Sequence, residues 1–567
     1  MTTPTTSEFV PIDLDASNWA NLQPLYQALL DRELKCSGCL ETLILDRSEL
    51  DAAASEAYAT LYINMTCHTD DEQKKKAYLA FVENVQPQLK KIGFELDKKI
   101  VSSPHVGDLE QKRYEVMLRD LTAEVELFRD ENVPLQTEDT KLGQQYSEVC
   151  GAMMVTFRGE EKTLPQMAKH LEETDRETRA EAWRLVTERR FQDHERLSHI
   201  FDQMIEFRQK IARNAGFENY RDYTFKAKHR FDYTPADCEA FHQGAAEVCV
   251  PVFRQLNSQR AESLGVDPLR PWDLAVDIKG RDPLRPFDEA EQMVAGTSRL
   301  FHRMGSALGD MFDTLRGGDC LDLDSRKGKA PGGYQEMRDR SRKPFIFMNA
   351  AGMQGDLETM IHEAGHAFHS ILCKQEPLLH YRHAPIEFAE VASMSMELLA
   401  HPFLDEFYDE AQAARAKRTH LEEMARLLPW IATIDAFQHW IYTNPTHSRD
   451  DRTAYWLELN DRFGAAVSWE GLEQFLAVSW QRQLHLFEVP FYYIEYGIAQ
   501  LGALQLWLQY KQDPTKAIAN YTRAMSLGGS RPLPELFAAA DLTFDFGPET
   551  MKRLMDEVQN ELEKLPL

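Results

Sequence analysis

The stretch from Gly355 to Ser370, GDLETMIHEAGHAFHS, constrains this chain more than any other part of its sequence. Asp356 suits the N-cap of a helix, and the residues after it suit about four helical turns. On such a helix His362 and His366 are four residues apart, so their imidazoles project from one face. The spacing predicts that both can bind one zinc ion, with Glu363 beside them on the adjoining face.

The pattern H-E-x-x-H is the signature of one large class of zinc peptidases. In that class the two histidines bind the metal, and the glutamate acts as the general base toward the attacking water. A catalytic zinc takes three protein ligands and keeps one position open. The motif therefore predicts a third ligand elsewhere in the chain.

A second helix, over residues 385–399 (PIEFAEVASMSMELL), supplies the candidates for that third ligand. Glu390 and Glu397 are seven residues apart and share one face, among apolar residues. Two carboxylates in such surroundings are costly unless a cation compensates them. We assign Glu390 as the third zinc ligand and Glu397 as the carboxylate that orients a ligating histidine. Glu387, one turn before Glu390, is the rival for either role.

The net charge and the apolar content of the chain limit which classes of molecule it can bind and where in the cell it can lie. The chain has 567 residues, enough for one large domain or two to three ordinary ones, and a formal net charge of -27. That acidity argues against nucleic acid or an anionic membrane as partner. The first residues, MTTPTTSEFVPIDLD, have no basic and apolar signal pattern, and no apolar run approaches the ~20 residues that cross a bilayer. We expect a cytoplasmic protein.

The number and spacing of the cysteines are consistent with the reducing conditions of the cytoplasm. Eight cysteines in so long a chain do not form a dense disulfide framework. Cys36 and Cys39 form a single C-x-x-C without a second pair. We interpret them as ordinary reduced thiols, with a metal or redox site as the alternative.

Most of the chain has the periodicity of amphipathic helices, which predicts a mainly α fold. We divide it into an N-terminal helical domain, residues 1–190, and a catalytic domain, residues 191–567. Residues 148–160 read as a short β segment, and GEEKTLPQM after it reads as a turn entering a helix. The clearest strand is residues 344–349, directly before the metal-binding helix.

This strand suggests how a substrate could be held. In zinc peptidases of this class an edge strand near the metal helix pairs with the peptide backbone. Phe345 and Phe347 would belong to that strand, and Gly332 and Gly333 would form a tight turn near the substrate. The alternative is a small hairpin that only closes the core.

A late aromatic segment follows, with His485 before Tyr492, Tyr493 and Tyr496. Tyr493 and Tyr496 are three residues apart and would share a helix face. Phenols can donate hydrogen bonds to an oxyanion, and these strengthen as its charge develops. Core packing is the alternative interpretation of such a cluster.

Several of these motifs, taken in order, resemble those of the oligoendopeptidase F family, which is related to thimet oligopeptidase and neurolysin. They are GKAPGGY, PFIFMNAAG, HEAGHAFH, EFAEVASMSMELL and PFYYIEYG. The match extends over roughly residues 110–560 and is closest from 330 to 500. The resemblance implies an elongated, two-lobed, mainly α metallopeptidase with a deep central channel, zinc at its floor and a small β-sheet beside the zinc helix. The N-terminal domain would form part of the channel wall.

The resemblance also implies roles for particular residues. One Zn²⁺ would be bound by His362, His366 and Glu390, with Glu363 as the general base. His485, Tyr493 and Tyr496 would contact the oxyanion and the substrate, with Tyr492 as the alternative to Tyr493. Glu397 and His369 would support the ligands rather than bind the metal. The residues expected to contact substrate are Gly332, Gly333, Tyr334, Phe345, Phe347 and Tyr492.

The predicted activity is therefore zinc-dependent hydrolysis of internal bonds in short peptides. A zinc exopeptidase on a similar scaffold is one alternative, in which Arg338, Arg340 or Arg342 would capture a terminal carboxylate. A catalytically silent, helical peptide-binding protein is the other. Short peptides are the expected partners, and a monomer and a homo-oligomer are both compatible with the sequence.

Overall fold

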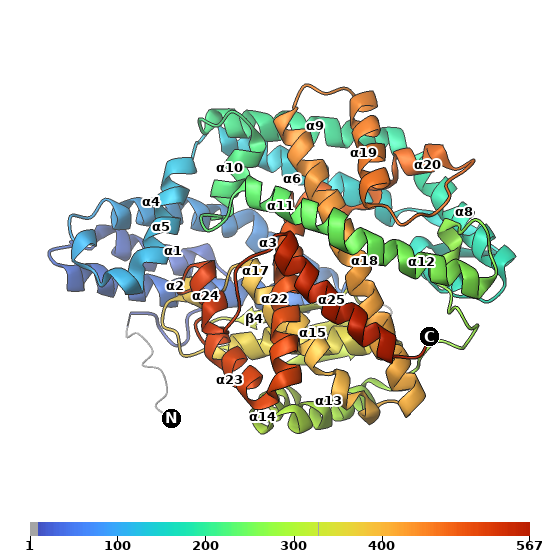
Figure 1. Cartoon of the computed structure of the whole chain (residues 1–567). Coiled ribbons are helices and arrows are strands. Elements are labelled where there is room, and N and C mark those ends of the chain that lie inside the picture. Colours follow the sequence, from blue (N-terminus) through green and yellow to red (C-terminus); the bar gives the residue numbers. More distant parts are fainter. Residues whose placement is uncertain (1–8, 327, 331) are drawn as a thin grey trace. The chain divides into compact units, whose positions relative to one another are not determined.

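Helices dominate the computed structural model, which describes residues 9–326, 328–330 and 332–567 (Figure 1). Two small sheets are the only strands among these described residues. The predicted mainly α class is therefore confirmed. Within the same residues, no helix combines the length and the apolar character needed to cross a membrane.

The chain divides into two units, each built from three separated segments. Unit 1 consists of Met1–Glu126, Arg285–Ala413 and Gly502–Phe544. Its elements are α1 (Trp19–Asp31), α2 (Ser37–Cys67), α3 (Glu72–Asn84), α4 (Gln86–Val101), η1 (Val106–Asp108), α5 (Gln111–Leu127), α13 (Ala290–Met304), α14 (Ser306–Arg316), β3 (Leu321–Asp324), β4 (Tyr334–Arg338), β5 (Lys343–Ala350), α15 (Gln354–Leu372), α16 (Leu379–Arg382), α17 (Ile386–Leu399), η5 (His401–Glu406), α23 (Pro514–Met525) and α24 (Leu533–Ala539).

Unit 2 consists of Leu127–Leu284, Ala414–Leu501 and Asp545–Leu567. Its elements are α6 (Asn132–Gly151), β1 (Met154–Phe157), β2 (Glu160–Thr163), α7 (Leu164–Met167), η2 (Ala168–Leu171), α8 (Arg176–Gln192), α9 (His194–Asn214), α10 (Tyr220–Ala227), α11 (Pro235–Gly244), the π-helical turn η3 (Ala245–Cys249), α12 (Val250–Leu264), η4 (Pro271–Asp273), α19 (Arg449–Phe463), α20 (Glu473–Ala477), η6 (Ser479–Arg482), α21 (Leu484–Glu488) and α25 (Pro548–Lys564). Helices α18 (Glu410–Thr443) and α22 (Tyr493–Gln512) contribute residues to both units. The predicted domain boundary at residue 190 falls near the end of α8 and stays a prediction.

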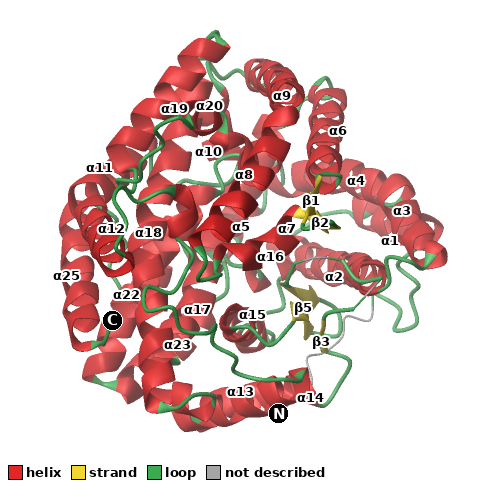
Figure 2. Cartoon of the chain, turned by 90° about the vertical axis from the view of Figure 1, so that its right-hand side faces the viewer, coloured by secondary structure: helices red, strands yellow, loops and turns green. Residues whose placement is uncertain are grey.

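The sheet of unit 1 has the strand order β3-β5-β4, with β3 parallel and β4 antiparallel to β5. The predicted strand at residues 344–349 is confirmed as β5, but its predicted place at the sheet edge is wrong. The short segment LDLD of β3 pairs with β5 on the side opposite β4, so β5 is the central strand. Figure 2 shows β3 and β5 beside α15, and α15 packs against both β5 and β4.

The two predicted site helices form as α15 and α17. The expected N-cap at Asp356 is wrong, because the helix begins earlier, with Met353 as the N-cap. Asp356 lies in the first turn, where its Oδ2 accepts the backbone N–H groups of Ala351 at 2.7 Å and Met353 at 2.9 Å. It therefore still satisfies backbone donors at this helix start.

In unit 2 the predicted short β segment becomes a hairpin of β1 and β2. The strand begins only at Met154, because α6 continues to Gly151. The part read as a turn contains the second strand instead. Arg158 and Gly159 both have positive φ, 52° and 84°, which suits the two-residue turn between antiparallel strands.

Candidate active site

A close approach of two helices positions the H-E-x-x-H motif in unit 1. A Cβ atom placed on Gly365 of α15 would lie 2.6 Å from the Cα of Ser393 and 2.7 Å from the carbonyl oxygen of Ala392, both on α17. Real Cβ atoms do not approach backbone this closely, so only glycine fits. The two helix backbones therefore touch at this position, between the two histidines of the motif.

This contact brings the three predicted ligands together. One donor atom each from His362, His366 and Glu390 lies within 4.8 Å of the other two. The Nε2 atoms of His362 and His366 lie 3.4 and 3.6 Å from Glu390 Oε2. The imidazole centroids are 4.9 Å apart, with their planes at 81°. All three donors face a common point.

Two further side chains fix the orientation of these donors. Glu397 Oε1 lies 2.6 Å from His362 Nδ1, so that ring is held through the nitrogen that faces away from Glu390. The Ser393 hydroxyl donates to Glu390 Oε2 at 2.9 Å. The sequence predicts the Glu397 contact but not that of Ser393, whose position one turn after Glu390 is the available signal.

Burial and charge act differently on the two histidines. Burial alone lowers the pKa of His362, but hydrogen bonds to Glu390 and Glu397 outweigh it and raise the pKa well above its usual value. His366 has no comparable carboxylate hydrogen bond, and burial lowers its pKa to about 4. Nearby Glu390 keeps a lowered pKa because hydrogen bonds and charge from the histidines outweigh its burial.

Glu363 lies on α15 between the two histidines in sequence, and only 7% of it is exposed. Burial raises the pKa of its carboxyl to about 7, and the backbone amide of Gln335 on β4 opposes that rise. The carboxyl therefore lies against the edge strand of the small sheet. An acid with this pKa near neutral pH can both take and give a proton.

The rival ligands lie outside this group. Glu387 and His369 are buried on α17 and α15, 5% exposed each, and neither belongs to the set of converging donors. The His369 ring lies 6.1 Å from that of Phe388, and burial lowers its pKa to about 3. Its Nε2 has no hydrogen-bond partner among the described residues. We keep His369 as a predicted supporting residue.

The predicted substrate-contacting residues of the sheet are largely packed. Phe345 and Phe347 are 5% and 0% exposed and join a core cluster with residues of α2. The Tyr334 ring stacks on Phe347 at 4.8 Å, and its hydroxyl lies 2.6 Å from Thr66 Oγ1. This favours the alternative in which these three aromatic side chains close the core.

The two glycines before β4 differ from each other. Gly332 has φ of +97°, a conformation that favours glycine, so the predicted turn is consistent with its backbone. A Cβ on Gly333 would lie 3.3 Å from Thr359 Cγ2 of α15. Gly333 therefore brings the chain close to the helix that carries the histidines.

The late aromatic cluster forms in unit 2, where α21 ends and α22 begins. The His485 ring lies 4.8 Å from Tyr493, 5.8 Å from Tyr492 and 6.1 Å from Tyr496. The Tyr496 ring lies 5.1 Å from Tyr492 and 5.7 Å from Tyr493. All four predicted members are thus brought together. Burial raises the pKa of Tyr493, against hydrogen bonds to Trp430 and Gln483.

A buried arginine that the sequence analysis missed holds the helix carrying His485. Arg208 of α9 is 0% exposed. Its guanidinium donates to the carbonyls of Leu486 at 2.9 Å and of Phe487, and to the Tyr442 hydroxyl at 2.7 Å. The charge is balanced by Asp139 at 3.1 Å. No local pattern could have shown this, because the contacts with Tyr442 and α21 span 234 to 279 residues.

Hydrogen bonds and an ion pair also fix the loop before Tyr492. Phe491 is a buried, non-glycine residue with φ of +64°, a strained conformation that persists only when its surroundings enforce it. Its N–H is satisfied by Gln438 Oε1, and its carbonyl accepts from Arg230. Arg230 also lies 2.6 Å from Glu495, a buried acid between the tyrosines. The peptide groups before and after Phe491 are therefore both fixed by hydrogen bonds.

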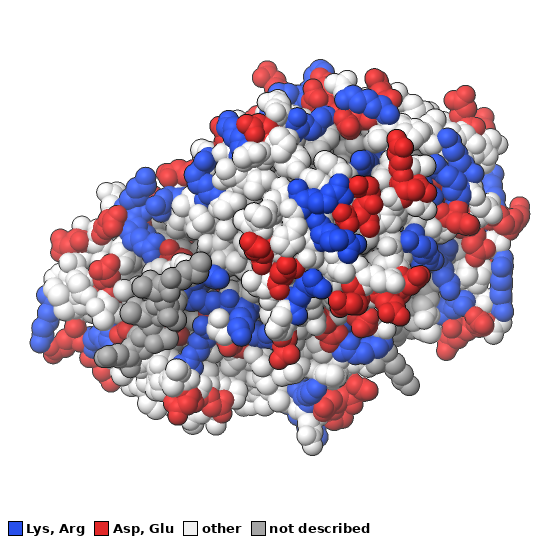
Figure 3. Space-filling model, turned by 90° about the horizontal axis from the view of Figure 1, so that it is seen from below, with Lys and Arg blue, Asp and Glu red and all other residues white. Residues whose placement is uncertain are grey.

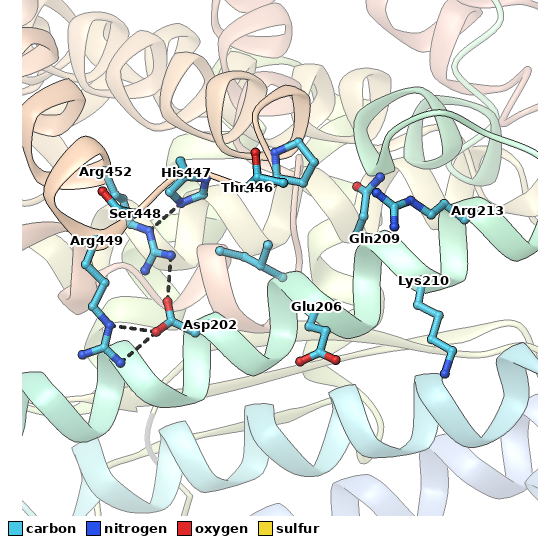
Figure 4. A pocket seen from close by; sticks show the side chains of 12 residues that line it. Asp202, Glu206, Gln209, Lys210, Arg213, Thr446, His447, Ser448, Arg449 and Arg452 are labelled. Carbon is cyan, nitrogen blue, oxygen red and sulfur yellow. Dashed lines mark hydrogen bonds and ion pairs between the residues drawn. The ribbon is translucent and has the colours of Figure 1, made fainter.

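A separate hollow in unit 2, of about 710 Å³, lies between α9 and the start of α19 (Figure 4). Figure 4 shows Asp202 bonded to both Arg449 and Arg452, at 2.7 Å each. The opposite charges at this end of the hollow therefore compensate one another. On the face of the protein shown in Figure 3, acidic and basic side chains are likewise interspersed.

Comparison with known families adds to this geometry. Residues 169–553 match the family model described as "Peptidase family M3", and residues 9–128 match the "Peptidase M3 N-terminal domain". Oligopeptidase PepF of Bacillus subtilis (strain 168) is 24% identical over 326 residues, 56% of this chain. The matched segment spans about half of that relative, 47% of its length.

Two solved structures resemble almost the whole chain. A structure of PZ peptidase A with an inhibitor has 26% sequence identity and a TM-score of 0.90, and the match covers 98% of this chain and 99% of that one. A structure assigned as an oligoendopeptidase F has 27% identity and a TM-score of 0.89, with the same coverage. The resemblance to oligoendopeptidase F is thus confirmed. Since the family model matches more than half of the sequence, this chain belongs to peptidase family M3.

Proposed function

We propose that this protein is a zinc-dependent oligoendopeptidase, which hydrolyses internal bonds of short peptides. The observation that carries the proposal is the convergence of His362, His366 and Glu390 within 4.8 Å, with Glu363 on the same helix. Membership of a peptidase family supports hydrolysis of peptides as the reaction. The names of PepF and of the oligoendopeptidase F structure support oligopeptides as the substrates.

The donor set fits one zinc ion. Two imidazole nitrogens and one carboxylate oxygen are the ligands of one well-known kind of catalytic zinc site. The hydrogen bond between His362 Nδ1 and Glu397 is the arrangement that fixes a metal-binding ring through its other nitrogen. Zinc bound there would supply a Lewis acid and would lower the pKa of water toward neutrality.

Glu363 would carry the proton through the reaction. As general base it takes a proton from the water that attacks the scissile carbonyl carbon, and it then gives that proton to the leaving amine nitrogen. Its burial beside Gln335 on the edge strand β4 excludes competing solvent from the carboxyl. The free edge of β4, within the described part of the sheet, is also the strand that could pair with a peptide backbone.

The late cluster would stabilise negative charge on the substrate carbonyl oxygen. Gln483 Nε2 lies 2.7 Å from His485 Nδ1, and an amide nitrogen can only donate. Nδ1 therefore accepts, and the proton of the neutral ring sits on Nε2, ready to be donated. We assign this role to His485, Tyr493 and Tyr496, with Tyr492 as the alternative to Tyr493.

The arginines that an exopeptidase would need are engaged elsewhere. Arg338 donates to the carbonyl of Asp319, Arg340 to that of Pro11 and Arg342 to that of Lys374. Since these cations anchor loops of unit 1, capture of a free carboxylate by them is the less favoured function. A silent binding protein is also less favoured, because every ligand of the predicted site is present.

The test is cleavage of an internally quenched peptide of about ten residues, blocked at both ends. We expect an internal cut that a chelator abolishes and added zinc restores. Cleavage restricted to peptides with a free terminus would instead establish an exopeptidase. No cleavage of either substrate by zinc-loaded protein would leave only peptide binding.

Single substitutions distinguish the residues that bind zinc from the residue that acts as the general base. Glu363→Gln should keep bound zinc and lose at least about a hundredfold in kcat. Glu358→Gln, the same change on the same helix, should keep both. Glu390→Gln should lose zinc whereas Glu387→Gln should retain it, and the reverse result would reassign the third ligand.

A further inference from the structure

Two helices of unit 2 each present a pair of metal-binding side chains one turn apart. Cys238 and His242 are four residues apart on α11, and Asp435 and His439 are four residues apart on α18. Residues at this spacing lie on one face of a helix. The two faces meet, since His242 Nε2 lies 2.8 Å from Asp435 Oδ2.

The donor atoms of three of these residues converge as closely as those of the H-E-x-x-H site. One atom each from Cys238, Asp435 and His439 lies within 4.8 Å of the other two. His439 Nε2 is 3.3 Å from Asp435 Oδ2. The rings of His242 and His439 lie 5.7 Å apart, with their planes at 88°.

The cluster is closed to solvent, and some of its polar atoms make no hydrogen bond. Cys238 and Asp435 are 0% exposed, His242 is 5% exposed and His439 is 7% exposed. Neither ring nitrogen of His439 makes a hydrogen bond within the described chain, although its Nε2 lies 3.3 Å from Asp435 Oδ2. Asp435 Oδ1 is also without a hydrogen bond there. Buried polar atoms without partners are costly and call for an explanation.

Apolar rings around His439 raise the free-energy cost of leaving these polar atoms without hydrogen bonds. The rings of Phe225 and Phe491 lie 5.9 and 5.6 Å from the His439 ring. The buried carboxylate of Asp435 is costly in such surroundings unless a cation compensates its charge.

We propose that Cys238, Asp435 and His439 form a second metal site, which binds a divalent ion of the zinc class. Cysteine sulfur, carboxylate oxygen and imidazole nitrogen are all donors that bind zinc in proteins. On binding, the Cys238 thiol loses its proton to solvent and the thiolate sulfur bonds the metal. The dication, the thiolate and the Asp435 carboxylate then sum to zero charge, which suits a buried site.

His242 would support Asp435 through their hydrogen bond, as residues beside a metal site orient its ligands. None of its donor atoms belongs to the proposed catalytic ligand set, which lies in unit 1. Its effect would be to join α11 to α18. Metal bound only by the folded chain stabilises that chain.

Cobalt substitution of the full-length protein tests the site. The protein is stripped with a chelator, loaded with excess Co²⁺, separated from free metal and measured by elemental analysis and near-ultraviolet absorption. A thiolate ligand gives a sulfur-to-cobalt charge-transfer band, which two histidines and a glutamate cannot give. We expect about two cobalt ions per chain and this band.

Two single variants show which residues bind each of the two cobalt ions. Cys238→Ser should bind about one cobalt ion, lose the band and keep its activity on the blocked peptide. His366→Ala should also bind about one cobalt ion but keep the band. The double variant Cys36→Ser/Cys39→Ser is the control for surface thiols and should behave as the wild type.

Two results would overturn the second site. One is wild-type protein that binds about one cobalt ion without the band. The other is a band that survives Cys238→Ser. If Cys238→Ser does not fold, the test rests on His366→Ala. Bound cobalt with the charge-transfer band in that variant supports the second site. Bound cobalt without the band, or no bound cobalt, overturns the second site. The dependence of peptide cleavage on the catalytic metal is tested separately, by the chelator and zinc experiment.

Discussion

The Cα atom of Ser393 lies only 2.6 Å from the point where a Cβ on Gly365 would stand. This contact between α15 and α17 falls three residues after Glu390 and one residue before His366. The distance between the histidine pair and the carboxylate is thus set by backbone contact rather than by flexible side chains.

Gly365→Ala should therefore weaken metal binding, because the added methyl group collides with backbone that can yield only if α17 moves. We expect at least about a tenfold rise in the Kd for zinc, measured by competition with a chromophoric chelator. Gly355→Ala is the matched control, since it lies on the same helix with no atom within 4 Å of the added Cβ. Equal zinc affinity in the two variants would contradict the role of the contact.

Glu397→Gln tests the support of His362. Loss of the carboxylate at 2.6 Å removes the charge that makes the imidazole a stronger ligand. We expect zinc affinity to fall by about 10- to 100-fold with little change in melting temperature. Unchanged affinity would assign Glu397 a packing role only.

Arg208 should act on catalysis through the helix that carries His485. Arg208→Met leaves two buried carbonyls and Asp139 without their partner, so we expect a loss of about 3 kcal/mol in unfolding free energy. It should also lower kcat while zinc content stays unchanged. Arg213→Met, an exposed change near the end of the same helix, is the control.

A double-mutant cycle distinguishes positioning from general destabilisation. If Arg208 acts through His485, its replacement should cost little further kcat in a His485→Ala background. Full additivity of the two losses in kcat would show that Arg208 serves stability alone.

Asp273 should make stability depend on pH in the acid range. It is fully buried and bonded to Arg176 at 2.7 Å and Arg179 at 3.1 Å. Burial alone would raise the pKa of this carboxyl, but hydrogen bonds from both arginines and from the Arg270 amide outweigh burial and lower it. Because the folded pKa is depressed, the stabilisation is complete above the unfolded pKa of about 4 and is lost as pH falls through the folded value.

Asp273→Asn should accordingly lower the unfolding free energy by about 3 kcal/mol at neutral pH, and the difference from wild type should shrink below about pH 4. Urea unfolding at a series of pH values measures both. Asp556→Asn, in an exposed pair with Lys552, should cost less than about 1 kcal/mol. A difference for Asp273→Asn that is constant down to pH 3 would refute the assignment.

Sequence reasoning succeeded where the determinant is local. The helical spacing of His362 and His366, and the family motifs, anticipated both site helices and the residues that converge. It failed on the sheet, because the four-residue LDLD strand is too short and too charged to be read as a strand and its pairing decides which strand is central. It also missed Arg208 and Glu495, whose partners are hundreds of residues away or on other elements.

The three-segment construction of unit 1 has a consequence for how the protein is made. Tyr521 of α23 is fully buried, and its hydroxyl lies 3.4 Å from the carbonyls of both Gly365 and Ala392. A ribosome releases α15 and α17 long before α23, so this contact with the helix pair can form only when nearly the whole chain has emerged. The last contacts that support the site helices can therefore form only when synthesis is almost complete.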